Sequence, residues 1–265
     1  MTTGHQLLEA LEARSDRSES VPDVAPAPTV FAHLDDLTGG LRPGQLWVIT
    51  GTPGQGRTIL LTQWAAQLAL TQRWRTWLVA PRERNDVVAA RILASLGRAP
   101  VLQLLSDELD AEQRHRVAGV RELLRSADLR TTTCPSRPCP SPDDVAKAPT
   151  TCAVLVDDAD LVPTATPQHL GALAPAGSLV VATLPRHVMV AGPHEDADLD
   201  PEWARAADVV IEVRSHGLVP GDLHARAGEA ELRVLRHRHG PTTTITVAFQ
   251  PYYGRLADMP DRPMS

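Results

Sequence analysis

Residues 45–58 read QLWVITGTPGQGRT, an apolar run that leads directly into a glycine-rich loop. The run has the composition of a buried strand, and residues 59–70 (ILLTQWAAQLAL) then show helical spacing. Every position of the phosphate-loop pattern G-x-x-x-x-G-K-[ST] is met except one, because Arg57 stands where a lysine is expected. The order strand, glycine loop, helix is the context in which such a loop binds phosphate.

The loop residues supply separate parts of a nucleotide site. Glycines let backbone N–H groups converge on phosphate oxygens, and the dipole of the following helix adds positive potential. Thr58 offers a hydroxyl for Mg²⁺, and Arg57 keeps the cation, although its planar guanidinium is bulkier than an ammonium. We therefore expect a site for ATP and Mg²⁺ whose binding residues are Gly51, Thr52, Pro53, Gly54, Gln55, Gly56, Arg57 and Thr58.

A second acidic site follows a later apolar run. The stretch TCAVLVDD (151–158) is typical of a buried parallel strand, and it ends in two acids. Asp157 offers a carboxylate at the carboxyl edge of the sheet, where it can order the water shell of Mg²⁺. Thr58 and Asp157 are thus the expected metal residues, whereas Asp158 and Asp160 receive no role.

Strands and helices alternate along the rest of the chain. We expect strands at 76–80, 178–184 and 207–213, helices at 85–96 and 110–127, and a Pro- and Cys-rich loop at 131–143. Residues 231–238 and 243–249 alternate on either side of Gly240-Pro241 and predict a hairpin. The fold class is therefore α/β, with a mainly parallel central sheet flanked by helices and a C-terminal antiparallel hairpin.

Composition points to one large domain in the cytoplasm. The chain has 265 residues and a formal net charge of −6, which argues against a broad basic surface for nucleic acid. No run approaches the roughly 20 apolar residues that span a bilayer, and the N-terminus lacks the order of a signal peptide. We expect residues 1–28 to form a helix (5–14) and a flexible linker, and 29–265 to form the domain. The helix is either a frayed terminus or a segment that docks on a neighbouring subunit.

Three segments resemble the C-terminal motor domain of replicative DnaB-type hexameric DNA helicases (superfamily 4). They are VFAHLDDLTGGLRPG at 30–44, the helical stretch at 96–129, and GEAELRVLRHRHGPTTTITVAFQPYYGRLAD at 228–258. The resemblance spans roughly residues 29–258 and implies a RecA-like P-loop NTPase fold. It also implies ATP and Mg²⁺ as cofactors, single-stranded DNA as a partner, and a homo-oligomeric ring or association with another DnaB-type subunit.

The hairpin carries the most specific part of this resemblance. Its two basic positions correspond to Arg236 and Arg238, which the family would direct toward the nucleotide of the next subunit. Arg238 would be the arginine finger that stabilises charge on the γ-phosphate in trans. The alternative for both arginines is a solvated strand face.

Three catalytic positions of the family are replaced together. Besides Arg57, the general-base glutamate after the second strand is replaced by Arg82 when counted back from Arg91, and only Glu83 next to it could substitute. The γ-phosphate-sensing glutamine after the fourth strand falls at Leu184 or Pro185. The DNA-facing loop that follows, VMVAGPHEDADLDPE (188–202), is acidic and has only Arg186 and His187 as nearby cations. Together these replacements predict slow or absent hydrolysis.

Two functions therefore remain open from the sequence. The first is an ATP-dependent helicase acting in DNA replication or unwinding, with Arg57, Asp157, Arg236, Arg238 and Glu83 as candidate catalytic residues. The second is a catalytically degenerate paralogue that binds nucleotide weakly or not at all and serves as an interaction or regulatory protein. A RecA-like recombinase or clock-type ATPase fits the C-terminal hairpin less well.

Overall fold

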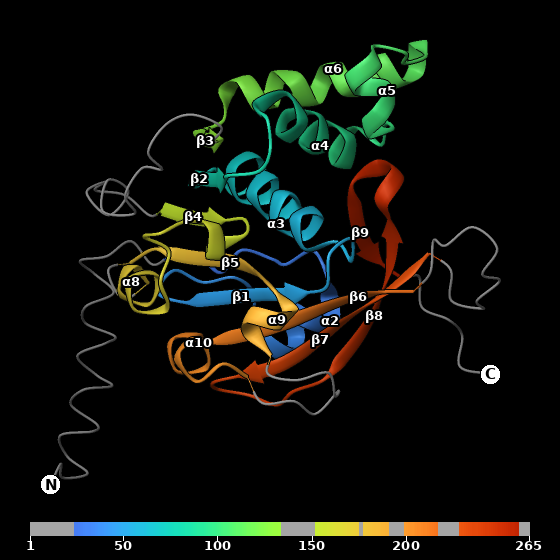
Figure 1. The fold of residues 1–265 in the computed structure, drawn as a ribbon. Helices are drawn as coiled ribbons and strands as arrows, with labels where there is room; N and C mark the ends of the chain where they lie inside the picture. The colour runs from blue at the N-terminus through green and yellow to red at the C-terminus, as the bar shows by residue number, and fades with distance from the viewer. Residues whose placement is uncertain (1–23, 134–151, 175–176, 191–198, 217–227, 260–265) are drawn as a thin grey trace, which may run out of the picture.

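A computed structural model describes residues 24–133, 152–174, 177–190, 199–216 and 228–259. In these ranges one nine-stranded sheet has the order β3-β2-β4-β5-β1-β6-β7-β8-β9 (Figure 1). The six strands from β3 to β6 run parallel, and β7, β8 and β9 continue the sheet antiparallel. The strands are β1 Leu46–Gly51, β2 Arg75–Ala80, β3 Leu129–Thr133, β4 Cys152–Val156, β5 Leu179–Pro185, β6 Val209–Ser215, β7 Glu229–His237, β8 Thr244–Gln250 and β9 Arg255–Asp258.

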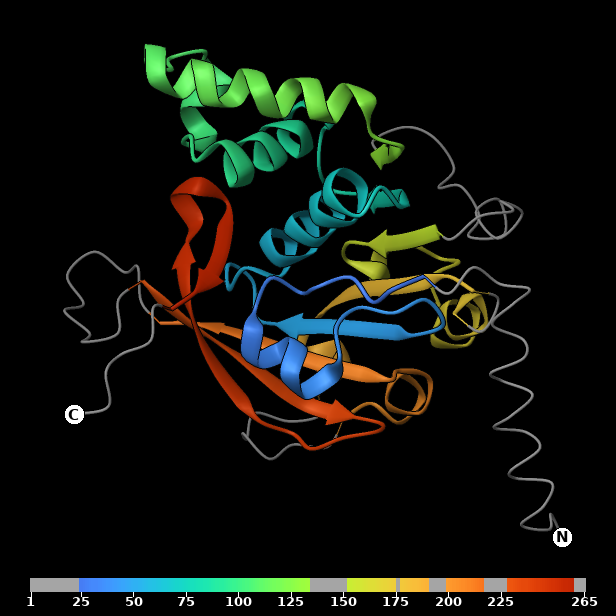
Figure 2. The ribbon, with the colours of Figure 1, turned by 180° about the vertical axis from the view of Figure 1, so that it is seen from behind.

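Helices cover both faces of this sheet. They are α2 Ala32–Thr38, α3 Arg57–Ala66 with a π-helical turn η1 Gln67–Thr71, α4 Asn85–Gly97, α5 Val101–Ser106, α6 Ala111–Ser126, α8 Pro167–Leu173, α9 Arg186–Met189 and α10 Pro201–Ala206. Short 3-10 turns, η2 Ala159–Leu161 and η3 Pro251–Tyr253, follow β4 and β8. Helices α8, α9 and α10 lie toward the viewer in Figure 1, and α2 lies on the opposite face in Figure 2.

Successive side chains of each central strand point to opposite faces of the sheet and so contribute to two separate hydrophobic cores. In β1, Trp47 and Ile49 face α2 and α3, whereas Leu46 and Val48 face the layer that contains α8 and α10. All six β1 residues are buried, as expected for a parallel strand covered on both faces. A third, small cluster joins α4 to α6, which stack beyond α3 at the top of Figure 1. The sheet is therefore the rigid support for every loop at its edges.

The predicted α/β architecture is confirmed, with shifts at the element ends. The strand at 45–50, the helix at 85–96 and the hairpin are all found within about two residues of their expected bounds. The predicted helix at 110–127 is α6, where Asp110 and Gln113 form a capping box in which each side chain bonds the other's backbone N–H. The prediction of a loop over 131–143 is wrong for 131–133, because these residues pair with β2 as strand β3.

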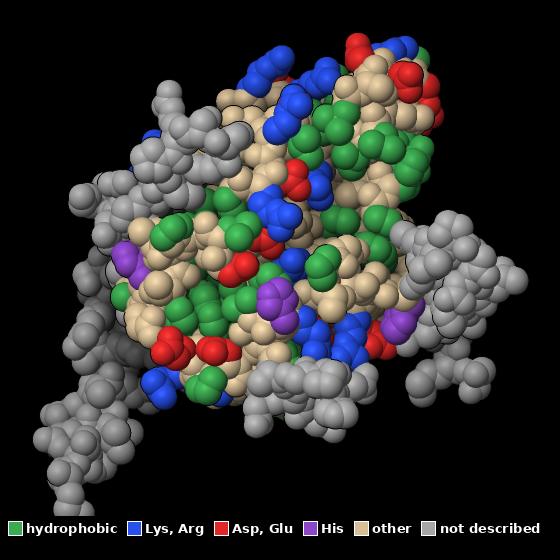
Figure 3. Space-filling view, in the orientation of Figure 1, with side chains coloured by type: hydrophobic (Ala, Val, Ile, Leu, Met, Phe, Trp, Pro, Cys, Tyr) green, Lys and Arg blue, Asp and Glu red, His purple; other side chains and the backbone are tan. Residues whose placement is uncertain are grey.

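The N-terminal helix predicted at 5–14 lies outside the described residues. The described chain joins the fold at Ala27, which is buried and pairs with Leu41. No helix in the described ranges is both long and apolar enough to cross a membrane. Figure 3 shows apolar side chains gathered on the face that carries α5, where Leu102 is 74% exposed.

The pair of tryptophans under α3 gives a test of the core. Trp64 is fully buried, meets Trp47 edge to face at 5.6 Å between ring centroids, and donates its indole N–H to the carbonyl of Thr29 at 2.9 Å. Trp64→Ala is expected to lower the free energy of unfolding by about 3–5 kcal/mol, because it leaves a large cavity in a packed interior. Urea denaturation measures this change.

Leu102→Ala is the control for that measurement, since its exposed side chain should cost within about 0.5 kcal/mol. An equal decrease in the free energy of unfolding for the two variants would contradict the assignment of Trp64 to the core.

Candidate nucleotide-binding site

The glycine-rich loop leaves β1 at the carboxyl edge of the sheet and enters α3. A Cβ on Gly51 would lie 2.6 Å from the carbonyl oxygen of Val213, and one on Gly56 would lie 2.9 Å from the ring of Phe249. Gly56 also has a φ of 105°, a conformation that favours glycine. Gly54 has no neighbour within 4 Å of such a Cβ, so the middle of the loop is open to a ligand.

The side chain of Gln55 fixes the loop to the neighbouring strand β6. Its Oε1 accepts hydrogen bonds from the backbone N–H of Ser215 and from the Ser215 hydroxyl, the latter at 3.0 Å. The backbone N–H of Gln55 donates weakly to the carbonyl of Thr52 at 3.4 Å. The loop is therefore held in its turn without any ligand.

Asp157 joins three elements at this edge. Its Oδ2 accepts a hydrogen bond from the Thr58 hydroxyl at 2.9 Å, and its Oδ1 accepts one from the Thr183 hydroxyl at 2.7 Å. Thr183 in turn accepts the backbone N–H of Asp158 at 2.7 Å. Because Asp157 is only 4% exposed, burial raises the pKa of its carboxyl above the ordinary value, and the charge of Asp158 adds to that rise while the threonine hydrogen bonds oppose it.

Arg57 and Arg82 converge on the neighbouring carboxylate, Asp158. Arg57 Nη2 lies 3.2 Å from Asp158 Oδ1, and Arg82 Nη1 lies 3.8 Å from Asp158 Oδ2. The Arg57 and Asp158 side chains are 11% and 13% exposed, whereas Arg82 is 70% exposed. Two positions at which the sequence departs from the helicase pattern therefore share one acidic partner.

Three other positions predicted from the sequence, Glu83, Leu184 and Pro185, lie at the ends of strands or beside them. Glu83 faces α4, where its Oε1 accepts a hydrogen bond from Arg91 Nη2 at 2.7 Å. Leu184 and Pro185 end β5 beside Thr50 and Gly51, and neither side chain has a hydrogen-bonding group. The structure therefore brings Thr58, Asp157 and Arg57 together and places Glu83 in an ion pair of its own.

The two hairpin arginines lie at the opposite edge of the sheet. Arg238 Nη1 pairs with Asp208 Oδ1 at 3.0 Å, and its Nη2 donates to the carbonyl of Arg205 at the end of α10 at 2.8 Å. Arg236 Nε donates to the carbonyl of Ala207 at 3.3 Å. Beside them is a hollow of about 590 Å³ lined by Thr38, Arg42, Pro43, Gly44, Gln45, Asp208, His237, Arg238 and His239.

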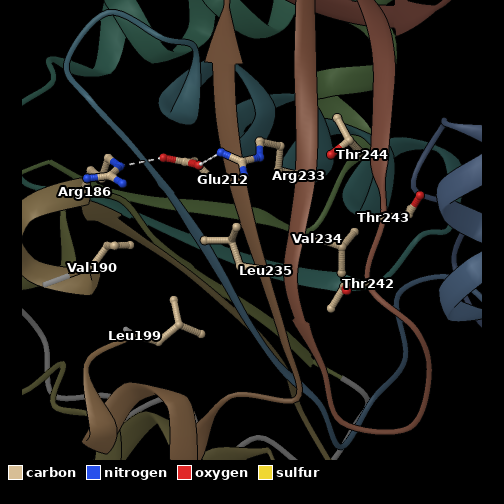
Figure 4. Close-up of a pocket in the computed structure, with 10 residues that line it drawn as sticks. All are labelled: Arg186, Val190, Leu199, Glu212, Arg233, Val234, Leu235, Thr242, Thr243 and Thr244. Atoms are coloured by element: carbon tan, nitrogen blue, oxygen red, sulfur yellow. Dashed lines mark hydrogen bonds and ion pairs between the residues drawn. The ribbon is translucent and has the colours of Figure 1, made fainter. Parts of the chain in front are cut away.

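A second group of arginines surrounds one buried glutamate between β5, β6 and β7. Glu212 is 2% exposed and pairs with Arg186 Nε at 2.8 Å, Arg214 Nε at 2.9 Å and Arg233 Nη1 at 3.2 Å. Figure 4 shows Glu212 between Arg186 and Arg233, beside a pocket of about 420 Å³. The sequence expectation that Arg186 and His187 are the only cations near this loop is wrong, because β7 brings Arg233 to the pocket that Val190 and Leu199, at the described ends of the loop, also line.

The residues present fit a magnesium–nucleotide ligand. Arg57 Nη1 is buried with no hydrogen-bond partner, so it can donate to an anion. Within the described ranges no three acidic, His or Cys side chains gather to hold a metal. Mg²⁺ does not need such a cluster, since it takes one or two protein ligands and completes its coordination shell with phosphate and water. Thr58 and Asp157 would hold it, and the ion would supply positive charge to the phosphates.

Sequence reasoning missed Thr183, Asp158 and the Gln55–Ser215 contact. Thr183 had a visible signal, because it is a hydroxyl residue inside the apolar run 179–184 that forms a buried strand. The only sequence signal for Asp158 was its position after Asp157. Its pairing with two arginines from other segments depends on the tertiary fold.

The raised pKa of Asp157 predicts how stability varies with pH. An acid whose pKa is raised by folding binds more protons in the folded state, so stability falls as pH rises from about 4 through the folded-state pKa. Asp157→Asn is therefore expected to gain stability over the parent protein toward pH 8 and to match it near pH 4. Urea denaturation across this range, with exposed Asp160→Asn as the control, measures the difference. Parallel profiles for the parent and Asp157→Asn would contradict it.

Comparisons with known proteins agree with this geometry. Residues 27–138 match the family described as the DnaB-like helicase C terminal domain. The chain is 26% identical, over 281 aligned positions, to the replicative DNA helicase DnaB of Leifsonia xyli subsp. xyli (strain CTCB07). That alignment covers 95% of this chain and 59% of the relative, so the chain spans about three-fifths of the relative's length.

Two solved structures share the fold. The ATPase domain of G40P superposes with a TM-score of 0.73 at 16% identity, covering 95% of this chain and 98% of that one. A DnaB-like replicative helicase, solved in a study of its interactions with primase, superposes with a TM-score of 0.73 at 15% identity. The superposition covers 95% of this chain and 66% of that one. With its parallel sheet, phosphate loop and antiparallel hairpin, the chain has the fold of these ATPase domains, and its sequence is similar to the C-terminal domain of DnaB-type helicases.

Proposed function

We propose that the phosphate loop at 51–58 binds adenine nucleotide with Mg²⁺ and that the domain acts in the cytoplasm on single-stranded DNA, in replication or unwinding. The contact between Thr58 and Asp157 carries this proposal, because it joins the loop to the acid at the carboxyl edge of the sheet. Backbone N–H groups of residues 51–56 would hold the phosphates, and Arg57 would neutralise their charge. Thr58 and Asp157 would orient the cation.

The position of the hairpin arginines supports action between subunits. Ser215, beside the phosphate loop, and Val209, which pairs with His237, are the two ends of β6. Six residue steps of strand separate them by about 20 Å. Arg238 cannot cross that distance to its own loop, so a role on phosphate requires the nucleotide of a neighbouring copy. We therefore propose a homo-oligomeric ring, or pairing with another DnaB-type subunit, with Arg238 and Arg236 facing the next phosphate loop.

The arginines around Glu212 support contact with a nucleic acid backbone. Three guanidinium groups meet on the carboxylate of Glu212, and Arg233 among them lines the neighbouring pocket, where a phosphate could reach it. Figure 3 shows arginine side chains grouped over the β6–β7 part of the sheet. Of the acidic loop at 188–202, residues 191–198 lie outside the described part of the chain. We propose that this arginine group binds the phosphates of single-stranded DNA.

The second candidate function is a nucleotide-binding regulatory subunit with little hydrolysis. A specific observation favours it, because Glu83 is held by Arg91 and Arg82 carries the wrong charge for a general base. Leu184 and Pro185 offer no group to sense the γ-phosphate. In that case the fold serves in assembly with catalytically complete subunits.

ATP turnover with and without single-stranded DNA separates the two candidates. The helicase function predicts turnover that DNA stimulates and that Arg238→Ala lowers about 10²-fold or more, since a finger in trans stabilises charge in the transition state. Arg205→Ala, an exposed arginine at the same sheet edge, is the matched control. Absent turnover with nucleotide still bound would support the regulatory function. A strictly monomeric species by light scattering, with and without nucleotide, would contradict a ring.

DNA binding has its own test in Arg233. Arg233→Ala leaves Glu212 paired with Arg186 and Arg214, so the buried carboxylate keeps its partners. The variant is expected to weaken binding of a labelled oligothymidylate and to reduce the slope of log affinity against log salt by about 1. Fluorescence anisotropy at several KCl concentrations measures both. Arg125→Ala on α6 removes the same charge far from this site, and an equal effect from it would contradict the proposal.

A further inference from the structure

Asp158 lies beside Arg57, the phosphate-loop residue at the position of the usual lysine. In phosphate loops the residue at the position of Arg57 reaches the β- and γ-phosphates. Arg57 Nη2 instead forms an ion pair with Asp158 at 3.2 Å, and Arg82, just after β2, approaches the same carboxylate at 3.8 Å. The acid thus pairs with the cation that would otherwise meet the terminal phosphates, and a second guanidinium group lies near the same carboxylate.

The guanidinium of Arg57 has one terminal nitrogen that is paired and one that has no hydrogen-bond partner. Nη2 is paired with Asp158, whereas Nη1 is buried and has no hydrogen-bond partner. A buried guanidinium N–H without an acceptor is costly, which indicates that a ligand oxygen completes it. The guanidinium can therefore keep its pair with Asp158 through Nη2 and donate through Nη1 to one oxygen of a β-phosphate.

Adding a third phosphate changes the balance of charge. Asp157 and Asp158 are adjacent acids, and Arg57 and Arg82 are the cations paired with Asp158. A γ-phosphate brings further negative charge to this edge and must take the guanidinium groups from Asp158, which leaves a nearly buried carboxylate unpaired. A diphosphate imposes no such exchange.

We propose that Asp158 sets the phosphate-length specificity of the loop, which accepts a nucleoside diphosphate with the Arg57–Asp158 pair intact and a triphosphate only after that pair opens. The inference rests on the nucleotide binding proposed above and names the ligand class that the site prefers. It also gives one physical cause for the joint replacement at Arg57 and Arg82, since both serve the same internal anion.

Calorimetric titration with ADP and with ATP, each with Mg²⁺, tests the proposal on the full chain. The parent protein is expected to bind ADP about tenfold or more tighter than ATP, the range of one disrupted charge pair. Asp158→Asn should lower the dissociation constant for ATP about tenfold and change that for ADP by less than about threefold. Asparagine suits the positive φ of 43° at this position, so the variant should keep the fold.

Two further variants control the measurement. Asp160→Asn removes the same charge from an exposed position two residues away and should behave like the parent protein. Asp158→Gly also accepts the positive φ and replaces Asp158→Asn if thermal unfolding shows that the latter does not fold.

The outcomes are distinct from those of the nucleotide-binding proposal itself. Tight ADP and ATP binding with no preference, or a preference unchanged in Asp158→Asn, would overturn the role of Asp158 while nucleotide binding stands. Binding of neither nucleotide by the parent or by Asp158→Asn would overturn both. ATP bound by Asp158→Asn but not by the parent would support both.

Discussion

The buried carboxylate of Asp157 is the constraint on which the rest of the site depends. It lies at the end of β4 and accepts hydroxyl hydrogens from α3 and from β5, so three segments distant in sequence meet on two oxygens. Burial of a charge is unfavourable unless hydrogen bonds compensate it. The two threonines supply part of this compensation without a ligand, although burial still raises the pKa of the carboxyl. The phosphate loop and the acid therefore stay in register, which a magnesium–phosphate site needs before either component arrives.

Around this fixed centre the charged residues have been rearranged. The sequence shows Arg57 and Arg82 as two of three catalytic positions replaced together, and in the folded chain both arginines meet on Asp158. Asp158 is the one anion in this group of three, so removing it alone would take this partner from both guanidinium groups. The edge of the sheet that binds phosphate in related folds thus contains an internal anion.

The sequence predicts features that follow from local chemistry. The apolar runs of β1, β4, β5 and β6, the glycine loop and the Gly240-Pro241 hairpin each carry a signal within a few residues, and each is found in the fold. Strand β3 carries only a weak signal, because Leu129–Thr133 has three β-branched threonines but no apolar run, and it pairs with β2 at the sheet edge. The Asp158 pairs and the arginines around Glu212 join different elements, and such contacts require the strand order.

The strand order also separates the two charged ends of the domain. The glycine-rich loop and Asp157 lie where β1 and β4 end, while Arg238 is held by Asp208, whose other oxygen accepts the first backbone N–H of β1 at 2.8 Å. The same strand β1 thus has the candidate nucleotide loop at one end and, at the other, an acid that anchors the candidate finger. In a ring, a shift of Arg238 toward a neighbouring nucleotide would break its pair with Asp208 and remove a cap from α10. Nucleotide bound in one copy would then be coupled to the start of β1 in the next through a single ion pair.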